Sequence, residues 1–421
     1  MIQVLSGSWA LFLGMFMLMV GNGLQGTLLG LRGDQEGFST FALSIVMSAY
    51  FVGFLFSSQV TPKLIRRVGH VRVFAALGST ISAVLIMYPI LVEPWAWTLG
   101  RVVIGFCFCG VYITAESWLN DASNNETRGK ALSIYLMVQM AGIVAAQYIV
   151  SIGDVSGYTL FIVPSILVSM AFAPILLSIR PTPQFAQTKP MSIKRLIEAS
   201  PLGCMGMFLL GGVFSAQFGM SAVYGSQIGL SVGQISLFVS VIYVSALFAQ
   251  YPIGWLSDRM DRRILILWIS FVGSAGAMVA FIFGDSFTAI LIGAAILGAT
   301  SNPLYALLIA YTNDYLERED MAAASGGLLF INGIGAIAGP LTVGWMMETI
   351  GAHGFWMFSA ALMFIMGLYA VYRMIRRSRA DQDYDLTSYA AVSSASSPIL
   401  VEVAQEIYVE EEIEENQSVS S

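Results

Sequence analysis

Charged residues are scarce in this chain. Asp, Glu, Lys and Arg make up 11% of its 421 residues and hydrophobic residues 57%, whereas a soluble domain has about 25% charged residues. Histidine and cysteine are also rare, with two and three residues, so no metal site is expected. The sequence lacks HExxH and P-loop motifs, which leaves no support for a zinc peptidase or an ATP-driven pump. These shortages favour a membrane protein that is not an enzyme and uses no cofactor.

Most of the sequence consists of long apolar runs. Each is long enough to cross a hydrocarbon core of about 30 Å as a helix. The runs are continuous rather than alternating, which argues against a strand barrel. We therefore predict an all-α integral membrane protein with twelve transmembrane helices, at about residues 8–29, 40–61, 71–90, 94–118, 131–152, 157–178, 201–224, 233–257, 262–283, 286–312, 322–347 and 353–375. The first run lacks a basic n-region and a cleavage site, so it is expected to be retained.

The basic residues predict the orientation. With the N-terminus in the cytoplasm, eighteen of the twenty Lys and Arg residues fall on the cytoplasmic side, while Arg32 lies outside and Arg101 within a span. This asymmetry predicts a protein of the cell inner membrane with both termini cytoplasmic. The segment after Arg379 has ten acidic residues and no basic one, which is typical of a disordered tail.

The chain contains an internal repeat. A shift of 193 residues lays Gly105 on Gly298 and Tyr112 on Tyr305. Duplicated halves related by an axis along the membrane normal are known from secondary transporters, which bind solute between the halves. The repeat predicts a six-helix bundle over 1–178, a cytoplasmic linker loop over 179–200, a second six-helix bundle over 201–376 and a disordered acidic cytoplasmic tail over 377–421.

Several motifs resemble those of the major facilitator superfamily. The sequence GWLSDRMDRR at 254–263 is similar to its cytoplasmic loop signature, and RVVIG at 101–105 to a second signature whose arginine is implicated in proton coupling in several members. The phrases AESWLND and ETRGKALSIY resemble the bacterial YcaD-like branch. The resemblance covers about residues 1–376. It implies the superfamily fold, with two pseudo-symmetric six-helix bundles, and transport of a small solute.

The chain also departs from the superfamily pattern. In the first half, the loop signature should carry Asp where this chain has Arg66, and Gly where it has Pro62. The Gly-Pro pair of helix 5 in drug antiporters is replaced by Ala146 and Gln147. These departures weaken a multidrug-antiporter interpretation.

Two charges in the fourth span are candidates for ion coupling. A charge at mid-bilayer costs about 2.5–3.5 kcal/mol even on a mild scale, and such residues are functional by default. Arg101, Gly105, Tyr112 and Glu116 share one helix face, but Arg101 and Glu116 are about 22 Å apart along the axis and cannot pair directly. The structural alternatives are an arginine tied to carbonyls or to a carboxylate of the outer mouth, and a glutamate bound to basic loops.

Uncharged polar residues in other spans are candidates for solute binding. Asn22 and Gln25 share a helix face, and Gln217, Ser221 and Tyr224 follow the spacing of another. Each could instead form an interhelical hydrogen bond. One arginine with amides and hydroxyls favours a small anionic or zwitterionic organic solute. The predicted substrate-binding residues are Asn22, Gln25, Arg101, Tyr112, Gln217, Tyr224, Asn302 and Tyr305, with Asn332 as a further polar residue of the eleventh span.

The loop at 254–263 supplies the gating candidates Asp258, Arg259 and Arg262. Asp258 is expected to cap the start of the fifth helix near Gly129 and help close the inner mouth. We predict a monomeric transporter that binds a small-molecule substrate and a coupling ion, most simply a proton, within the lipid bilayer, and that binds no nucleic acid. The alternative is a non-transporting protein of the same fold that acts as a sensor or as an assembly factor for another membrane complex.

Overall fold

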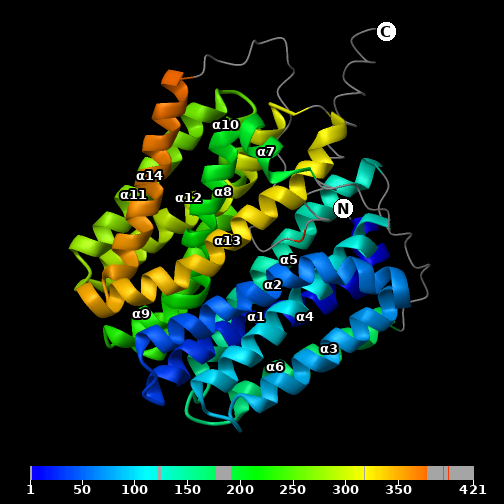
Figure 1. Ribbon diagram of the computed structural model, residues 1–421. Helices are drawn as coiled ribbons and strands as arrows, with labels where there is room; N and C mark the ends of the chain where they lie inside the picture. Colours follow the sequence, from blue (N-terminus) through cyan, green and yellow to red (C-terminus); the bar gives the residue numbers. More distant parts are fainter. Residues whose placement is uncertain are drawn as a thin grey trace.

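Figure 1 shows the computed structural model of the protein, which describes residues 2–121, 125–176, 191–316 and 318–376 together with Val392 and Ser397. These residues form helices and no strand. The helices of the first half, coloured blue to blue-green, and those of the second half, coloured green to orange, form two groups. The all-α fold with two helical bundles is therefore confirmed.

The helices follow the predicted spans closely. Eleven helical segments of the described chain are long and apolar enough to cross a membrane, and α6 is a shorter apolar helix in the sixth place. The bounds in the first half are α1 (Ile2–Gln35), α2 (Thr40–Val68), α3 (His70–Met87), α4 (Pro94–Asp121), α5 (Asn125–Ile152) and α6 (Thr159–Leu176). Those in the second half are α7 (Ile193–Ala199), α8 (Pro201–Ser215), η1 (Ala216–Met220), α9 (Ser221–Gln227), α10 (Val232–Ser257), α11 (Arg262–Ile282), α12 (Phe287–Asn313), α13 (Arg318–Ile350) and α14 (Gly354–Arg376).

Short polar residues and glycines set the helix ends. The Ser39 hydroxyl accepts a hydrogen bond from the Ala42 N–H at the start of α2, which satisfies a donor that the first turn leaves unpaired. Ser231 and Gln234 form a reciprocal capping box at the start of α10. Gly69 separates α2 from α3 with φ 86°, a conformation that side chains with a Cβ rarely adopt.

The seventh span is interrupted by a turn of π-helix. The segment η1 lies between α8 and α9 and contains Gln217. A π turn carries an extra residue, so it rotates the side chains that follow relative to an unbroken α-helix. The predicted face with Gln217, Ser221 and Tyr224 assumes an unbroken helix and is therefore altered.

Glycines bring helix backbones together at repeat-equivalent places. A Cβ at Gly105 of α4 would overlap the carbonyl oxygen of Tyr50 in α2. A Cβ at Gly298 of α12 would likewise overlap the carbonyl oxygen of Ile242 in α10. The duplication thus preserves one tight helix crossing in each half.

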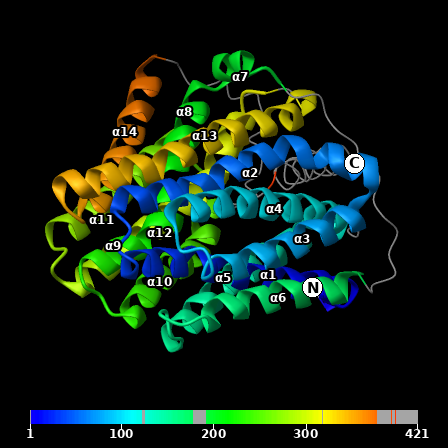
Figure 2. The same cartoon turned by 60° about the horizontal axis from the view of Figure 1, so that its bottom comes forward.

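The two halves contact each other at the end where α1 stops and α2 begins, which we call the sealed end. The Ser226 hydroxyl donates to the Asp34 carboxylate at 2.6 Å, and the Phe41 N–H donates to Glu348 Oε1 at 2.9 Å. Figure 2 shows α2 lying alongside α13, across the boundary between the halves. These polar contacts join α1 to α9 and α2 to α13.

Candidate functional site

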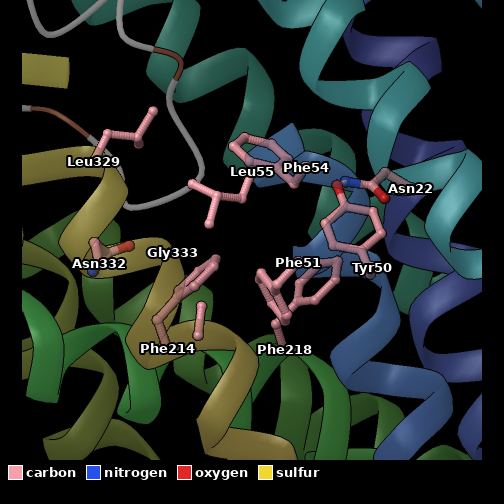
Figure 3. Close-up of a pocket in the computed structure, with 11 residues that line it drawn as sticks. Asn22, Tyr50, Phe51, Phe54, Leu55, Phe214, Phe218, Leu329, Asn332 and Gly333 are labelled. Atoms are coloured by element: carbon pink, nitrogen blue, oxygen red, sulfur yellow. Dashed lines mark hydrogen bonds between the residues drawn. The ribbon is translucent and has the colours of Figure 1, made fainter. Parts of the chain in front are cut away.

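A cavity lies between the two halves. It encloses about 500 Å³ of empty space, part of it open to solvent. Its walls come from α1 and α2 on one side and from α8, η1 and α13 on the other. Figure 3 shows its polar side chains, which are Asn22 and Tyr50 from the first half and Asn332 from the second.

Aromatic rings make up much of the cavity wall. Phe214 and Phe218 stack with ring centroids 6.0 Å apart and an interplanar angle of 19°. Phe51 meets both rings edge-on, at 6.2 and 6.1 Å. Tyr50 packs on Phe218 with centroids 5.4 Å apart, so the aromatic cluster joins α2 to η1 across the boundary between the halves.

Arg101 is fully buried behind this wall. Its Nη1 donates to Gln25 Oε1 at 2.8 Å, and its Nη2 donates to Met47 Sδ at 3.5 Å. Its guanidinium carbon lies 4.8 Å from the centroid of the Tyr50 ring, within the range of a cation–π interaction. Its Nε has no hydrogen-bond partner, and no carboxylate of the described residues forms an ion pair with it.

Gln25 connects Arg101 to further polar groups. Gln25 Nε2 donates to Asn22 Oδ1 at 3.0 Å. Asn22 Nδ2 donates to the Tyr112 hydroxyl at 2.8 Å and to the Tyr50 hydroxyl at 3.4 Å. We call these five residues, Arg101, Gln25, Asn22, Tyr50 and Tyr112, the Arg101 network. Four of them are predicted solute-binding residues, and the structure brings them together, although among these four only Asn22 lines the cavity.

Tyr50 is the member that sequence reasoning missed. It stands in an apolar stretch of the second span, and its neighbours Phe51 and Phe54 are apolar. A tyrosine hydroxyl inside a span usually needs a hydrogen-bond partner, which is the one signal that could have identified it.

Glu116 belongs to a second polar cluster. Its carboxylate is buried and accepts hydrogen bonds from the Tyr135 hydroxyl at 3.0 Å and from the Ser397 hydroxyl. Ser397 and Val392 fall in the segment expected to be a disordered tail, yet both are buried. The remaining residues of 377–421 lie outside the described part of the chain, so the tail and the other domain boundaries stay predictions.

Two candidates of the second half are bonded within that half. Gln217 Nε2 donates to Ser301 Oγ at 2.9 Å. Tyr224 stacks on Phe355 with centroids 5.2 Å apart, and its hydroxyl lies 3.3 Å from His353 Nδ1. Neither Gln217 nor Tyr224 lines the cavity.

The two candidates of α12 have polar atoms without partners. Asn302 Oδ1 and the Tyr305 hydroxyl are buried and form no hydrogen bond within the described chain. Asn302 also lines a second cavity of about 320 Å³ with Gln250 and Val392. Because unpaired buried polar atoms are costly, these two residues are candidates for contact with water or solute.

The gating candidates lie between the end of α10 and the first residue of α11. Arg262 is buried, and it donates to Ser257 Oγ at 3.1 Å, to the Ala310 carbonyl at 3.2 Å and to the Asp314 carboxylate. Its Nη2 lies 3.9 Å from Asp258 Oδ1. This arginine therefore ties the 254–263 loop to the C-terminal end of α12, where the helix dipole favours a cation.

Arg259 takes no part in this contact with α12. Its guanidinium carbon lies 4.3 Å from the centroid of the Trp255 ring. The predicted contact of Asp258 with the start of α5 near Gly129 stays a prediction, because the side chains of 121–129 are outside the described set.

Comparisons with known proteins agree with this fold. The family model for the Major Facilitator Superfamily matches residues 11–224 and again residues 202–398. The "Uncharacterized MFS-type transporter YcaD" of Salmonella arizonae is 24% identical over 359 residues, which cover 84% of this chain and 92% of that protein. The two matches overlap over residues 202–224, the first reaching from the first half into the second and the second extending past residue 376.

Two solved transporters have similar structures. The nucleoside transporter NupG has a TM-score of 0.72 at 15% identity, covering 88% of this chain and 100% of that one. A bacterial homolog of the human lysosomal transporter Spinster, inward-facing and unoccupied, has a TM-score of 0.67 at 14% identity, covering 97% and 98%. Both likenesses concern the fold. The family match shows a transporter rather than an enzyme, and the chain belongs to the Major Facilitator Superfamily.

Proposed function

We propose that this protein is a secondary active transporter that moves a small organic solute by alternating access. The observation that carries the proposal is the cavity between the halves, which polar and aromatic side chains from both halves line. A site shared by two bundles can open to either side of the membrane as the bundles rock. The cavity is therefore the proposed solute site, and the two halves are the moving parts.

The distribution of basic residues supports an orientation for this cycle. It puts the connection between α1 and α2 outside the cell. On this orientation the sealed end is periplasmic. Closing the inner mouth would involve the gating candidates Asp258, Arg259 and Arg262, which follow the end of α10, and the end of α12, to which Arg262 is bonded.

We assign proton coupling to Glu116. Its carboxylate is buried within α4 and has hydroxyl donors that can hold either protonation state. Arg101, the other coupling candidate, has no carboxylate partner among the described residues, and we assign it the role of organising the solute site.

The test uses purified protein in proteoliposomes, with a solute found by a thermal-shift screen. Wild-type protein should exchange this solute across the membrane, and an imposed proton gradient should accelerate net flux. Glu116→Gln should keep solute exchange and lose the acceleration. Glu198→Gln, which removes an exposed carboxylate of α7, is the matched control and should behave as wild type.

If folded protein binds a solute but never exchanges it, the proposal fails and the sensor or assembly-factor alternative takes its place. If Glu116→Gln keeps the full response to the proton gradient, the assignment of coupling to Glu116 is wrong, whereas the transport proposal stands.

A further inference from the structure

The Arg101 network has a fixed direction. A guanidinium can only donate hydrogen bonds, so the amide oxygen of Gln25 must face Arg101. The Gln25 nitrogen then faces the Asn22 oxygen, and the Asn22 nitrogen faces the tyrosine hydroxyls. Each amide orientation follows from the one before, and every bond donates away from the buried cation.

The network ends at two hydroxyls with different surroundings. Tyr112 accepts from Asn22 and donates to Met19 Sδ at 3.7 Å. Tyr50 also accepts from Asn22, lines the cavity, and donates no hydrogen bond within the described chain. A hydroxyl that accepts from a chain beginning at a cation is polarised and becomes a better donor. The first-half wall therefore offers a solute the proton of Tyr50.

The opposite wall offers an acceptor. Asn332 Nδ2 donates to the Met207 carbonyl at 3.0 Å. A carbonyl can only accept, so the amide nitrogen is fixed at Met207 and the amide oxygen is left for the cavity. Figure 3 shows this oxygen of Asn332 on the cavity side. The two polar ends of the cavity thus have opposite hydrogen-bonding character.

The space between these ends suits a flat and uncharged molecule. The rings of Phe51, Phe214 and Phe218 line it, and aromatic faces favour the faces and edges of other rings. No residue lining the cavity in the described chain is charged. Arg101 lies behind Tyr50 and does not reach this space, so the anionic or zwitterionic solute suggested by the sequence has no cation to bind there.

We propose that the cavity binds a neutral, planar ring compound with a hydrogen-bond acceptor at one end and a donor at the other. Tyr50 donates to the acceptor, Asn332 accepts from the donor, and the aromatic wall covers the ring. Arg101 and Gln25 act as positioning residues, since they orient Asn22 and Tyr50 without touching the solute. This inference names the substrate class of the proposed transport site and rests on that proposal.

The test measures binding of matched probes to the purified full chain by isothermal titration calorimetry. Para-hydroxyacetophenone has the ring, the acceptor and the donor. Para-methylacetophenone lacks the donor, para-ethylphenol lacks the acceptor, and para-hydroxybenzoate carries a negative charge. We expect the first probe to bind about tenfold more tightly than each of the others, because each leaves one polar group unpaired or buries a charge.

Variants assign each end of the probe to a side chain. Tyr50→Phe keeps the ring and loses the donor, so it should weaken binding of the two acetophenones about tenfold and leave para-ethylphenol unchanged. Asn332→Leu should weaken binding of para-hydroxyacetophenone and para-ethylphenol and leave binding of para-methylacetophenone unchanged. Gln25→Met interrupts the network and should also weaken binding of the two acetophenones, by less than Tyr50→Phe, while leaving para-ethylphenol unchanged. A general loss of folding would instead weaken binding of every probe.

The binding test stands apart from transport. The expected pattern in protein that does not transport would support the solute class and contradict the proposed function. Equal affinity for the four probes, tightest binding of para-hydroxybenzoate, or no binding of any ring probe by folded protein would overturn the solute class, whether or not other solutes are transported.

Discussion

The two halves share a repeat but place their buried arginines differently. In the first half, Arg101 lies well within α4 and is bonded to an amide, a sulfur and an aromatic face. In the second half the equivalent position is Ala294, and the fully buried arginine is Arg262, at the end of a helix and paired with Asp314. Arg101 is therefore bonded to neutral polar groups, whereas Arg262 forms an ion pair.

The two halves have the same helix crossings but different buried polar side chains. The glycine crossings at Gly105 and Gly298 are kept, because any Cβ there would overlap a carbonyl oxygen of the neighbouring helix. The polar side chains are not kept as a set. We infer that the repeat preserves the framework, while the Arg101 network belongs to the first half and the Arg262–Asp314 ion pair to the second.

The largest expected effect is at Arg262. Arg262→Met removes the cation that pairs with the Asp314 carboxylate. Removing one partner of a buried ion pair lowers the free energy of unfolding by about 3–5 kcal/mol. The variant should have a markedly lower melting temperature in detergent, followed by a thiol-reactive dye or by loss of monodisperse protein. A melting temperature equal to wild type would show that this ion pair contributes nothing to stability.

The same substitution at Arg101 should act in the opposite direction on stability. Arg101 has no carboxylate partner in the described chain, so Arg101→Met removes a buried charge without leaving a carboxylate unpaired, and the melting temperature should hold or rise. Solute binding should nevertheless fall, by less than the tenfold expected for Tyr50→Phe, because the network loses its starting donor while Tyr50 remains. Destabilisation as large as that of Arg262→Met would erase the distinction between the two arginines.

The glycine crossings should respond equally in the two halves. Gly105→Ala and Gly298→Ala each force α4 or α12 away from its neighbour, and overpacking of this kind costs about 1–3 kcal/mol. Gly326→Ala is the control, since a Cβ at Gly326 of α13 meets no atom within 4 Å, and it should be neutral or slightly stabilising. A large effect in only one half would mean that the repeat does not preserve the framework.

The smallest effects are expected at the repeat-equivalent tyrosines. Tyr112→Phe leaves the Asn22 amide with one acceptor fewer and should cost about 1 kcal/mol. Tyr305→Phe removes a buried hydroxyl that has no partner among the described residues, so stability should stay level or rise slightly. Thermal melts of the two variants without solute measure the difference, and a larger loss for Tyr305→Phe would reveal a partner for its hydroxyl.

The framework of the protein follows from its sequence. The length of the apolar runs locates the membrane helices, and the repeat together with the loop motif at 254–263 indicates the superfamily. Helix periodicity places Arg101 with Tyr112, and Asn22 with Gln25, on shared faces, but the connection between these two pairs depends on how α1 packs against α4. A linear pattern does not contain that packing.

Other parts of the site depend on local or tertiary features that the spacing of residues along the sequence does not predict. In the sequence, Tyr50 looks like any other aromatic residue of an apolar span. Its contact with Arg101 depends on how α2 packs against α4. An unbroken helix would place Tyr224 on a face with Gln217, but the π turn at 216–220 rotates it, and Tyr224 packs on Phe355 instead. Aromatic composition alone does not say which rings line a cavity.

Arg101 also has an electrical consequence. A fixed positive charge held behind the wall of the cavity raises the potential inside it, and such a charge in a pore is a barrier to cations. Sodium and hydronium ions are therefore disfavoured along the route that a neutral solute takes, which would keep passive ion leak low while the cavity is open. In the proposed cycle a coupling proton would then travel by the separate cluster around Glu116, and solute and ion would cross the membrane by different paths.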